Sequence, residues 1–305
     1  MNSIDISIII VNYNTENYLN YCLNSIIRNI KGINYEIIVV DNNSSDNSVN
    51  FIKKNYPTIN IIQNHENYGY AKANNQGLKL AKGNFILLLN PDTEIRNNTI
   101  VDMFEFMNRN PRTGISGCRV INPNNKLQWD SCGSFLTPYL LALKKIGIET
   151  LIPYHRHIGK RLLYYWPRDS IRKIDWVSGV CMLIRKETMK NVGLLDEGFF
   201  AYMEDMDYCR RAALKNWTVY FLNYPKIIHK VSSSWQKYSK QQIFISLKSE
   251  KLYLTKYYGR FGFVSFKIFN LIGSYIKLLA NLAINHKKES KDHLMILKWV
   301  LKNDL

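Results

Sequence analysis

Three acidic residues lie close together in the stretch FFAYMEDMDYCRRA, residues 199–212, where Glu204, Asp205 and Asp207 are bracketed by aromatic side chains. A carboxylate can remove the proton of a hydroxyl group, and partial burial raises its pKa toward the working range of a base. Aromatic ring faces also suit contact with sugar rings. Alternatively, the acids mark the start of a helix, whose dipole favours negative charge there. The dipole explains the charge, but the aromatic setting favours a base that acts on a hydroxyl.

Two further residues are candidates for a metal site. Asp92 follows the apolar run FILLL within NPDTE, residues 90–94. Mg²⁺ and Mn²⁺ take few protein oxygens and complete their shell with phosphate and water, so one acid can hold the ion against a diphosphate. His229 is a second candidate ligand, since imidazole suits Mn²⁺. The alternatives are a Pro-Asp turn for NPDTE and an ordinary surface position for His229.

Two stretches could contact a nucleotide. Asp41 ends the run EIIVVD, where it could accept a hydrogen bond from a base imide or a ribose hydroxyl. It could equally cap the next helix, together with Ser44 or Ser45. Residues 67–77, NYGYAKANNQG, combine Gly and Asn at a strand-to-helix junction, whose donors can meet a phosphate. This stretch is neither a dinucleotide-binding fingerprint nor a P-loop, and a plain helix entry is the alternative.

The elements that must position these residues alternate between strand and helix. Apolar runs predict strands over 5–13, 35–43, 59–67 and 84–92, and helical patterns lie between them. Such alternation predicts a mostly parallel sheet covered on both faces. Ligands of such sheets bind at the carboxyl ends of the strands. Four polar stretches follow the four runs, so the candidate residues are expected to meet at one edge.

Later elements are predicted with the same signals. The helix over residues 17–29 should bury one face, formed by Leu19, Cys22, Leu23, Ile26 and Ile27. Residues 144–173 read as a basic loop, residues 175–187 as one further strand, and residues 236–305 as helices. The five cysteines have neither metal-knuckle nor redox spacing, which indicates reduced thiols in a cytoplasm-like compartment.

Positive charge gathers in the last quarter of the chain. The formal net charge is +17, and residues 230–305 hold 14 Lys+Arg against 4 Asp+Glu. This distribution fits either a nucleic-acid binder or a protein that rests on an anionic bilayer. The apolar stretch 261–284 is interrupted by Lys267 and Lys277, and each central charge costs about 2.5–3.5 kcal/mol on insertion. A helix lying in the membrane interface, or a charged helical cap on the domain, is therefore favoured over a membrane span.

Taken in order, the segments resemble glycosyltransferase family 2, closest to its rhamnosyltransferase-like branch. The resemblance covers roughly residues 4–235 and implies a GT-A type α/β fold, with a mostly parallel sheet flanked by helices and a C-terminal helical extension. It implies a catalytic domain over 1–235 and a basic helical region over 236–305. The matching segments are SIIIVNYN, EIIVVDNNSSD, NYGYAKANNQG, FILLLNPD, WVSGVCMLIRKE, GLLDEGFFAYMEDMDYCRRA and IIHKVSSSW.

The resemblance also assigns roles to residues. Asp205 corresponds to the catalytic base, with Glu204 beside it as its rival, and Trp176 and Gly179 would lie near the acceptor. The metal site would use Asp92 and His229. Asn90 stands where the family usually has the first acid of its metal motif, and it adds no charge. The donor site would be formed by Asn12, Tyr13, Asn14, Asp41, Asn67, Gly69, Asn74 and Asp92.

The implied activity is inverting transfer of a sugar, with rhamnose favoured, from a dTDP- or UDP-linked donor to a hydroxyl of a saccharide or lipid-linked acceptor. A divalent metal, Mg²⁺ or Mn²⁺, would assist, and the product would enter cell-surface polysaccharide synthesis. The enzyme would be cytoplasmic and peripheral on the inner face of the membrane. Two alternatives stay open, a nucleotidyltransferase acting on sugar phosphates and a non-catalytic nucleic-acid-binding protein. Acids at the strand ends argue against nucleic acid, because they repel phosphate backbones.

Overall fold

The computed structural model describes residues 3–230 and 240–302 of the chain. The chain divides into two compact units. The sheet unit comprises residues 1–133 and 168–237, and the helical unit comprises residues 134–167 and 238–305. The predicted domain boundary at residues 235/236 lies outside the described residues, as does the stretch 231–235 of the IIHKVSSSW segment, so both stay predictions.

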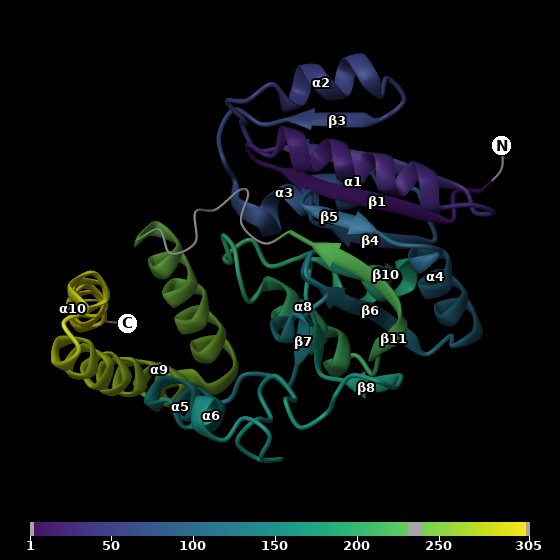
Figure 1. The fold of residues 1–305 in the computed structure, drawn as a ribbon. Coiled ribbons are helices and arrows are strands. Elements are labelled where there is room, and N and C mark those ends of the chain that lie inside the picture. The colour runs from purple at the N-terminus through teal and green to yellow at the C-terminus, as the bar shows by residue number, and fades with distance from the viewer. Residues whose placement is uncertain (1–2, 231–239, 303–305) are drawn as a thin grey trace. The chain divides into compact units, whose positions relative to one another are not determined.

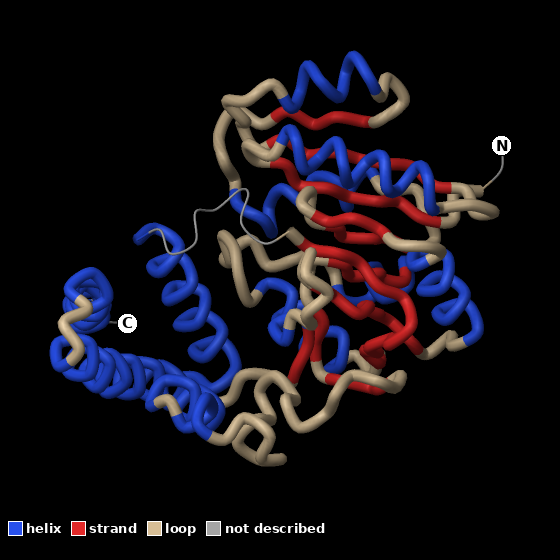
Figure 2. Tube along the Cα trace, in the orientation of Figure 1, coloured by secondary structure: helices blue, strands red, loops and turns tan. Residues whose placement is uncertain are grey.

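The sheet unit is built on one mixed sheet with the strand order β3-β2-β1-β4-β10-β6-β11-β5, in which β8 also pairs with β11 (Figures 1 and 2). The first four strands of this order run parallel, and β6 is parallel to β11, whereas β10 is antiparallel to both of its neighbours. The predicted mostly parallel α/β fold is confirmed. The strands are β1 (Ile6–Asn12), β2 (Tyr35–Asp41), β3 (Asn60–Gln63), β4 (Phe85–Leu89), β5 (Thr93–Ile95), β6 (Thr113–Ile121), β8 (Arg172–Ile174), β10 (Cys181–Arg185) and β11 (Thr218–His229).

Strand β1 shows why the sheet folds this way. Its residues Ile8, Ile9 and Ile10 point to alternate faces, and all three are fully buried. Both faces of the sheet are therefore covered, which is what a continuous apolar strand requires. The parallel register places Asn12 opposite Asp41. Two predicted donor-site residues thus lie side by side at the carboxyl edge because of register alone.

Helix α1 (Glu16–Asn29) packs on the sheet through Leu19, Cys22, Leu23 and Ile26, which are fully buried. The prediction for Ile27 was wrong, since 42% of this residue is exposed. At about 100° per residue, Ile27 falls at the margin of the stripe that the other four define. The other helices of the unit are α2 (Ser48–Asn55), α3 (Gly69–Leu80), α4 (Thr99–Arg109), α7 (Lys186–Val192) and α8 (Glu204–Leu214), with a 3₁₀ turn over Trp129–Ser131.

The predicted single strand over residues 175–187 is interrupted. Strand β9 (Trp176–Val177) pairs with β7 (Cys132–Gly133) in a separate two-stranded ribbon, and β10 (Cys181–Arg185) joins the main sheet. Between β9 and β10, the backbone of residues 178–180 forms hydrogen bonds outside any ladder, to Asp205 and Asn90. This turn connects two parts of the candidate site.

The helical unit consists of α5 (Pro138–Ile146), α6 (Ile148–Leu151), α9 (Lys240–Ala283) and α10 (Lys287–Lys302). The predicted basic loop over residues 144–173 is therefore wrong at both ends, because α5 and α6 extend to residue 151 and β8 begins at Arg172. Helix α5 begins with Thr137, whose Oγ1 accepts a hydrogen bond from the Leu140 N–H, followed by Pro138 in the first turn. Helix α9 is kinked at Gly259, where φ is 56°. A left-handed backbone of this kind favours glycine.

A close approach and an ion cluster hold α5 against α9. A Cβ at Gly273 would lie 2.5 Å from the carbonyl oxygen of Lys145, so a larger residue there would force the helices apart. The Glu250 side chain, 2% exposed, accepts from Lys144 at 2.9 Å and from Lys145 at 2.7 Å. Asn270 donates a further bond to Glu250. The buried charge is thus fully paired.

Candidate active site

The carboxyl ends of β1 and β2 form the first part of the site. Asn12 Nδ2 donates to Asp41 Oδ1 at 2.7 Å, and the Ser44 hydroxyl donates to the same oxygen at 2.6 Å. The Ser44 N–H donates to Asp41 Oδ2 at 2.9 Å. Asn14 accepts from the Ser45 N–H at 2.7 Å and adopts a left-handed φ of 54°. Asp41 therefore holds the loop after β2. It does not cap the next helix, as the alternative predicted, because α2 begins only at Ser48 after Asn47. A carboxylate bonded in this way retains lone pairs for a ligand.

The start of α3 forms the second part. Asn67 Oδ1 accepts from the Gly69 N–H at 2.9 Å and thereby fixes the helix entry. Gly69 has φ of 77°, and a Cβ there would lie 2.3 Å from the carbonyl oxygen of Phe200. The Tyr70 N–H donates to that same oxygen. Asn74 is buried and donates to the Tyr70 carbonyl at 2.9 Å. The segment before α8 therefore rests directly on the entry to α3.

The turn of residues 178–180 joins the acidic stretch to the end of β4. The Gly179 N–H donates to Asp205 Oδ2 at 3.1 Å, and the Tyr70 hydroxyl donates to the Gly179 carbonyl at 2.7 Å. One residue on, the Val180 carbonyl accepts from the Asn90 N–H at 3.1 Å. Two hydrogen bonds from adjacent turn residues thus connect Asp205 with the strand end that carries Asp92. A Cβ at Gly179 would lie 2.7 Å from the Tyr70 hydroxyl, so this turn has no room for a larger residue.

The neighbouring acids Glu204 and Asp205 begin α8 and differ in their surroundings. Glu204 is buried, and its Oε2 has no hydrogen-bond partner among the described residues. Burial raises the pKa of Glu204 well above its usual range, and the nearby charge of Asp205 adds to the shift. Burial also raises the pKa of the partly exposed Asp205, while hydrogen bonds from Gly179 and Met206 oppose that shift. Burial therefore disfavours the charged form of both acids, and the hydrogen bonds to Asp205 favour its carboxylate.

Asp207, the third acid of the stretch, has a structural role. It is fully buried, and its Oδ2 accepts from Arg211 Nε at 2.8 Å, one helical turn further on. Arg211 in turn donates to the carbonyl oxygens of Val192 and Leu194. This ion pair holds α8 to the segment after α7. The three acids therefore divide into a base candidate, a buried neighbour and a structural ion pair.

The predicted metal ligands Asp92 and His229 are brought together. His229 Nε2 lies 3.1 Å from Asp92 Oδ1, and both residues are buried. They come from adjacent elements, because the Lys230 N–H donates to the Asp92 carbonyl and β11 pairs with β5. On the other side of the ring, His229 Nδ1 lies 2.8 Å from Gln128 Oε1. Gln128 is therefore part of this site.

Gln128 determines which imidazole nitrogen carries the hydrogen. Its Nε2 donates to the His229 carbonyl at 2.9 Å and to Asn122 Oδ1 at 2.5 Å. The amide cannot be turned around without facing two acceptors with its oxygen, so Oε1 accepts from His229 Nδ1–H. In the neutral ring, Nε2 is then a bare nitrogen that faces the Asp92 carboxylate. Among the described residues, no group of three or more His, Cys, Asp or Glu side chains could hold a metal ion.

The acceptor candidates are placed differently from each other. Gly179 contacts Asp205 directly. Trp176 is 6% exposed and lies in β9, which precedes the turn of residues 178–180. Tyr13, a donor-site candidate, is partly exposed beside Asn12. None of these placements tests the predicted roles, which remain predictions.

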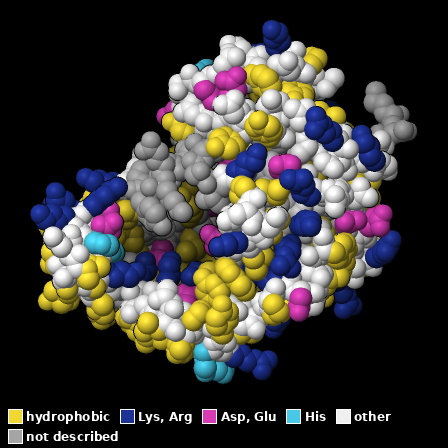
Figure 3. All heavy atoms as spheres, viewed as in Figure 1, with side chains coloured by type: hydrophobic (Ala, Val, Ile, Leu, Met, Phe, Trp, Pro, Cys, Tyr) yellow, Lys and Arg dark blue, Asp and Glu magenta, His cyan; other side chains and the backbone are white. Residues whose placement is uncertain are grey.

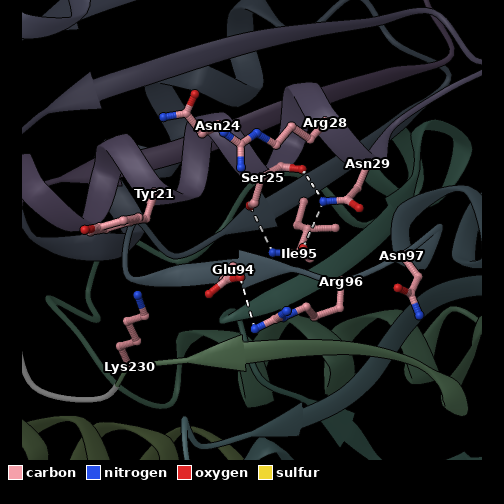
Figure 4. Close-up of a pocket in the computed structure, with 10 residues that line it drawn as sticks. All are labelled: Tyr21, Asn24, Ser25, Arg28, Asn29, Glu94, Ile95, Arg96, Asn97 and Lys230. Atoms are coloured by element: carbon pink, nitrogen blue, oxygen red, sulfur yellow. Dashed lines mark hydrogen bonds and ion pairs between the residues drawn. The ribbon is translucent and has the colours of Figure 1, made fainter.

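A cavity of about 510 Å³ lies elsewhere in the sheet unit, between α1 and β5 (Figure 4). Figure 4 shows the ion pair between Glu94 of β5 and Arg96, which follows β5, and draws Arg28 on α1 above them. Lys230 lies at one end, directly after His229 in the chain. None of the predicted site residues lines this cavity, so the candidate chemistry does not take place in it. Its lining is Tyr21, Asn24, Ser25, Arg28, Asn29, Glu94, Ile95, Arg96, Asn97 and Lys230.

Three residues that position the site were missed from sequence. Tyr70 supports the 178–180 turn, Gln128 orients His229, and the buried Asn75 exchanges hydrogen bonds with the backbone of Leu195. Tyr70 and Asn75 lie within the recognised stretch 67–77 but carry no charge that would single them out. Gln128 precedes its partner by 101 residues, so no local pattern marks it.

Comparison with known proteins identifies relatives along most of the chain. The chain is 28% identical to the low-salt glycan biosynthesis hexosyltransferase Agl10 of Haloferax volcanii over 70% of its own length and 62% of that protein. It is 23% identical to the N-acetylglucosaminyl-diphospho-decaprenol L-rhamnosyltransferase of Mycobacterium tuberculosis, over 63% and 66% of the two chains. It is 24% identical to the rhamnosyltransferase WbbL of Escherichia coli, over 82% and 92%. The chain thus spans less than two thirds of the first two relatives.

Solved structures share the fold at low identity. The mannosyltransferase PcManGT from Pyrobaculum calidifontis, in complex with GDP-Man and Mn²⁺, matches with a TM-score of 0.58 at 12% identity, over 99% of this chain and 87% of that one. GalNAc-T7 with UDP, GalNAc and Mn²⁺ matches with a TM-score of 0.58 at 16% identity, over 85% and 51%. At these identities the likeness concerns the fold alone.

The sequence profile of one family covers more than half of the chain. Residues 7–174 match the profile described as glycosyl transferase family 2, and these residues include the ends of β1, β2 and β4 that carry the candidate donor site. The resemblance inferred from the seven segments is confirmed, and this chain belongs to glycosyl transferase family 2.

Proposed function

We propose that the chain is an inverting glycosyltransferase that moves a sugar from a nucleoside-diphosphate sugar to a hydroxyl of a saccharide or lipid-linked acceptor. Family membership supports glycosyl transfer, and the relatives in Haloferax, Mycobacterium and Escherichia support glycan synthesis. The two relatives named as rhamnosyltransferases favour rhamnose as the sugar and dTDP as its carrier. The single observation that carries the proposal is the turn of residues 178–180, which bonds to Asp205 on one side and to the end of β4 on the other.

Asp205 is proposed as the base that removes the acceptor proton. It is partly exposed, so an acceptor can reach it, and its pKa is raised by burial. The Gly179 N–H donates to Oδ2 and the Met206 N–H to Oδ1, so both carboxylate oxygens are held in place. Glu204 lies buried beside it, and its raised pKa disfavours a second negative charge at the same point. The deprotonated hydroxyl then attacks the anomeric carbon from the face opposite the diphosphate, which inverts its configuration.

Asp92 and His229 fit a divalent cation. Adjacent ligands of an octahedral Mg²⁺ lie about 3 Å apart, close to the 3.1 Å between Asp92 Oδ1 and His229 Nε2. Gln128 holds the imidazole in the tautomer that leaves Nε2 available, as a hydrogen-bonded neighbour commonly does for ligating histidines. Two protein ligands suffice, because phosphate and water complete the shell of such ions. When bound, the ion would neutralise charge on the departing diphosphate. Two neighbours of the same fold contain Mn²⁺, which supports the choice.

The donor itself would lie over the ends of β1 and β2 and the start of α3. Asn12, Asn14 and Asp41 form one hydrogen-bonded network there, and Asn67 with Gly69 shapes the other wall. A backbone without side chain at Gly69 keeps the helix entry close to the segment before α8. These residues would bind the nucleoside, while the strand end with Asp92 receives the phosphates.

Product analysis tests the activity. The purified chain is incubated with dTDP- and UDP-linked sugars, Mn²⁺ or Mg²⁺, and a saccharide or lipid-linked acceptor. We expect release of a nucleoside diphosphate together with a glycoside of inverted anomeric configuration. Release of pyrophosphate would identify a nucleotidyltransferase instead, and retained configuration would exclude direct displacement.

A matched pair of variants tests the metal role of Asp92. We expect Asp92→Asn to lose the gain in donor affinity that Mn²⁺ gives to the unmodified chain, measured by titration with and without the ion. Asp46→Asn, an acid in the loop after β2, should retain that gain. If Asp92→Asn still responds fully to Mn²⁺, then Asp92 does not hold the ion.

A further inference from the structure

The part of α9 that follows the kink at Gly259 has a buried side and an exposed apolar side. On its inner side, Phe263, Phe266 and Asn270 are buried within the helical unit. On its outer side, six large apolar residues are between 43% and 68% exposed, namely Phe261, Ile268, Ile272, Tyr275, Leu279 and Leu282. We call these six residues the outer stripe. Figure 3 shows hydrophobic side chains gathered along the lower edge of this unit, where Figure 1 draws α9.

The spacing of the outer stripe is helical. Its members follow one another at intervals of three, four or seven residues, so they occupy one face roughly 100° wide. A helix on the surface of a soluble protein normally carries polar and charged residues opposite its buried face. Here the face opposite the buried residues is apolar over about six turns, counted from residues 261 to 282. Contiguous exposed apolar surface of this extent marks an interaction site.

The packing of α9 argues against a membrane span. By length and composition alone α9 could cross a membrane, with a mean hydropathy of 1.4 in its most apolar window, of which 33% is buried. Its inner side, however, lies against α5, where Gly273 touches the backbone of Lys145. A helix held by protein along one side and apolar along the other fits an orientation parallel to a bilayer surface.

We propose that the outer stripe docks the chain on an anionic lipid bilayer, with α9 lying in the plane of the interface. Basic residues bracket the stripe, with Lys256 and Arg260 before it and Lys287 and Lys288 after it, and all four are exposed. Clusters of Lys and Arg beside an apolar helix face are attracted to anionic headgroups. The apolar stripe supplies contact with the acyl chains and the flanking charge selects anionic lipid.

This docking surface deepens the proposed function, because a lipid-linked acceptor is presented at such a bilayer, yet it does not depend on that function. The stripe lies in the helical unit, and every candidate catalytic residue lies in the sheet unit. Vesicle binding and sugar transfer can therefore fail separately.

Vesicle sedimentation with paired variants tests the proposal. We expect the unmodified chain to sediment with vesicles of phosphatidylcholine mixed with phosphatidylglycerol, and more weakly with phosphatidylcholine alone. Ile272→Gln/Leu279→Gln should weaken binding about tenfold, since each substitution removes an apolar group from the acyl boundary. The matched control is Ile27→Gln/Leu80→Gln in the sheet unit, whose residues are 42% and 53% exposed against 43% and 50% in the stripe. This control should bind as the unmodified chain does.

A second pair separates charge from apolar contact. Lys287→Gln/Lys288→Gln should reduce binding to the mixed vesicles severalfold and leave the weak binding to phosphatidylcholine unchanged. Turnover with a soluble acceptor should stay the same in all of these variants. Unchanged hydrogen exchange of the buried side of α9 would show that the helical unit is still folded in them. Equal vesicle binding by Ile272→Gln/Leu279→Gln and its control would overturn the proposal. A lipid-free dimer that Ile272→Gln/Leu279→Gln dissociates would also overturn it, because the stripe would then join two copies of the chain.

Discussion

Glu204 and Glu250 are both buried glutamates, and the two units of the molecule treat them in opposite ways. In the sheet unit, Glu204 has another acid beside it, and its Oε2 has no partner among the described residues. Burial and the charge of Asp205 raise its pKa well above the usual range. In the helical unit, Glu250 accepts from Lys144 and Lys145. Burial opposes its ionisation, but the two ammonium groups outweigh burial and lower its pKa to about 2.

The difference teaches which buried acid is available for chemistry. Glu250 is committed to an ion cluster with fixed geometry, so its charge serves to hold α5 against α9. Burying a charged lysine in the same cluster is unfavourable. Burial outweighs the attraction of Glu250 and lowers the pKa of Lys145 to about 8. Among the described residues, no Lys or Arg is paired in this way with Glu204 or Asp205. Strongly perturbed acids without a structural partner are candidates for catalysis.

The largest expected effect is on turnover. Asp205→Asn removes the proposed base while keeping the side chain's shape, so turnover should fall about 10²–10⁴-fold with donor affinity unchanged. Single-turnover kinetics and a donor titration measure the two quantities. Asp169→Asn, an exposed acid of the same unit, is the control and should retain full turnover. Unchanged turnover in Asp205→Asn would remove this residue from the role of base.

The second effect is on stability of the helical unit. Glu250→Gln leaves Lys145 buried without its carboxylate, which should lower the free energy of unfolding by about 3 kcal/mol. Hydrogen exchange resolved on α9 measures the loss in that unit. Glu105→Gln breaks an exposed pair with Arg109 and should change stability by about 0.5 kcal/mol or less. Equal losses in the two variants would mean that the buried cluster adds no more than a surface pair.

Acidification should reproduce the loss in Glu250→Gln. The pKa of Glu250 is about 2 in the folded chain against 4.5 for the free group, so its ionised form stabilises the fold above about pH 4.5. That contribution, about 3 kcal/mol, is lost as the pH falls from 4.5 toward 2. Protection of α9 from hydrogen exchange should therefore decline over this window in the unmodified chain. The Glu250→Gln variant should show a much smaller decline, and an equal decline in both would assign the acid sensitivity to other groups.

The smallest expected effect is on the pH dependence of stability due to Glu204, which should have the opposite sign to that of Glu250. The pKa of Glu204 is raised in the folded chain, so the unfolded chain ionises first and stability falls as the pH rises above 4.5. Glu204→Gln removes this loss and should leave the chain at least as stable as before at neutral pH. Turnover should fall less than in Asp205→Asn, because Glu204 is the neighbour of the base. Destabilisation comparable with that of Glu250→Gln would show that Glu204 is ionised and paired.

Much of the fold followed from local patterns. The apolar runs that became β1, β2 and β4 are continuous because both faces of the sheet are covered, and that signal is present within each run. Helix α1 was predicted through its stripe, with Ile27 misplaced because it lies at the margin. The run over 175–187 was read as one strand, since its apolar letters do not reveal that the Gly179 N–H bonds to Asp205 instead of a ladder.

The candidate site likewise contains residues that the sequence predicted and residues that it did not. The sequence predicted the candidate residues that follow apolar stretches, because polar side chains are unusual there. These are the acids of 204–207, Asp92 and the Asn-rich strand ends. The partners that orient them were not visible, because they are neutral and distant. Gln128 contacts His229 across 101 residues, and Tyr70 contacts Gly179 across 109.

The sequence by itself determined the first four strands of the sheet, the edge at which they end and the residues able to do chemistry, because these depend on periodicity and residue type within a few turns of chain. Tertiary structure alone decided the state of each acid. Whether the pKa of a buried carboxyl is raised, as in Glu204, or lowered, as in Glu250 beside two lysines, depends on the groups that surround it after folding. Burial and nearby charge set that balance. The charge that acts on Glu204 comes from its neighbour Asp205, but its burial comes from the fold, and Glu250 is paired with Lys144 across 106 residues.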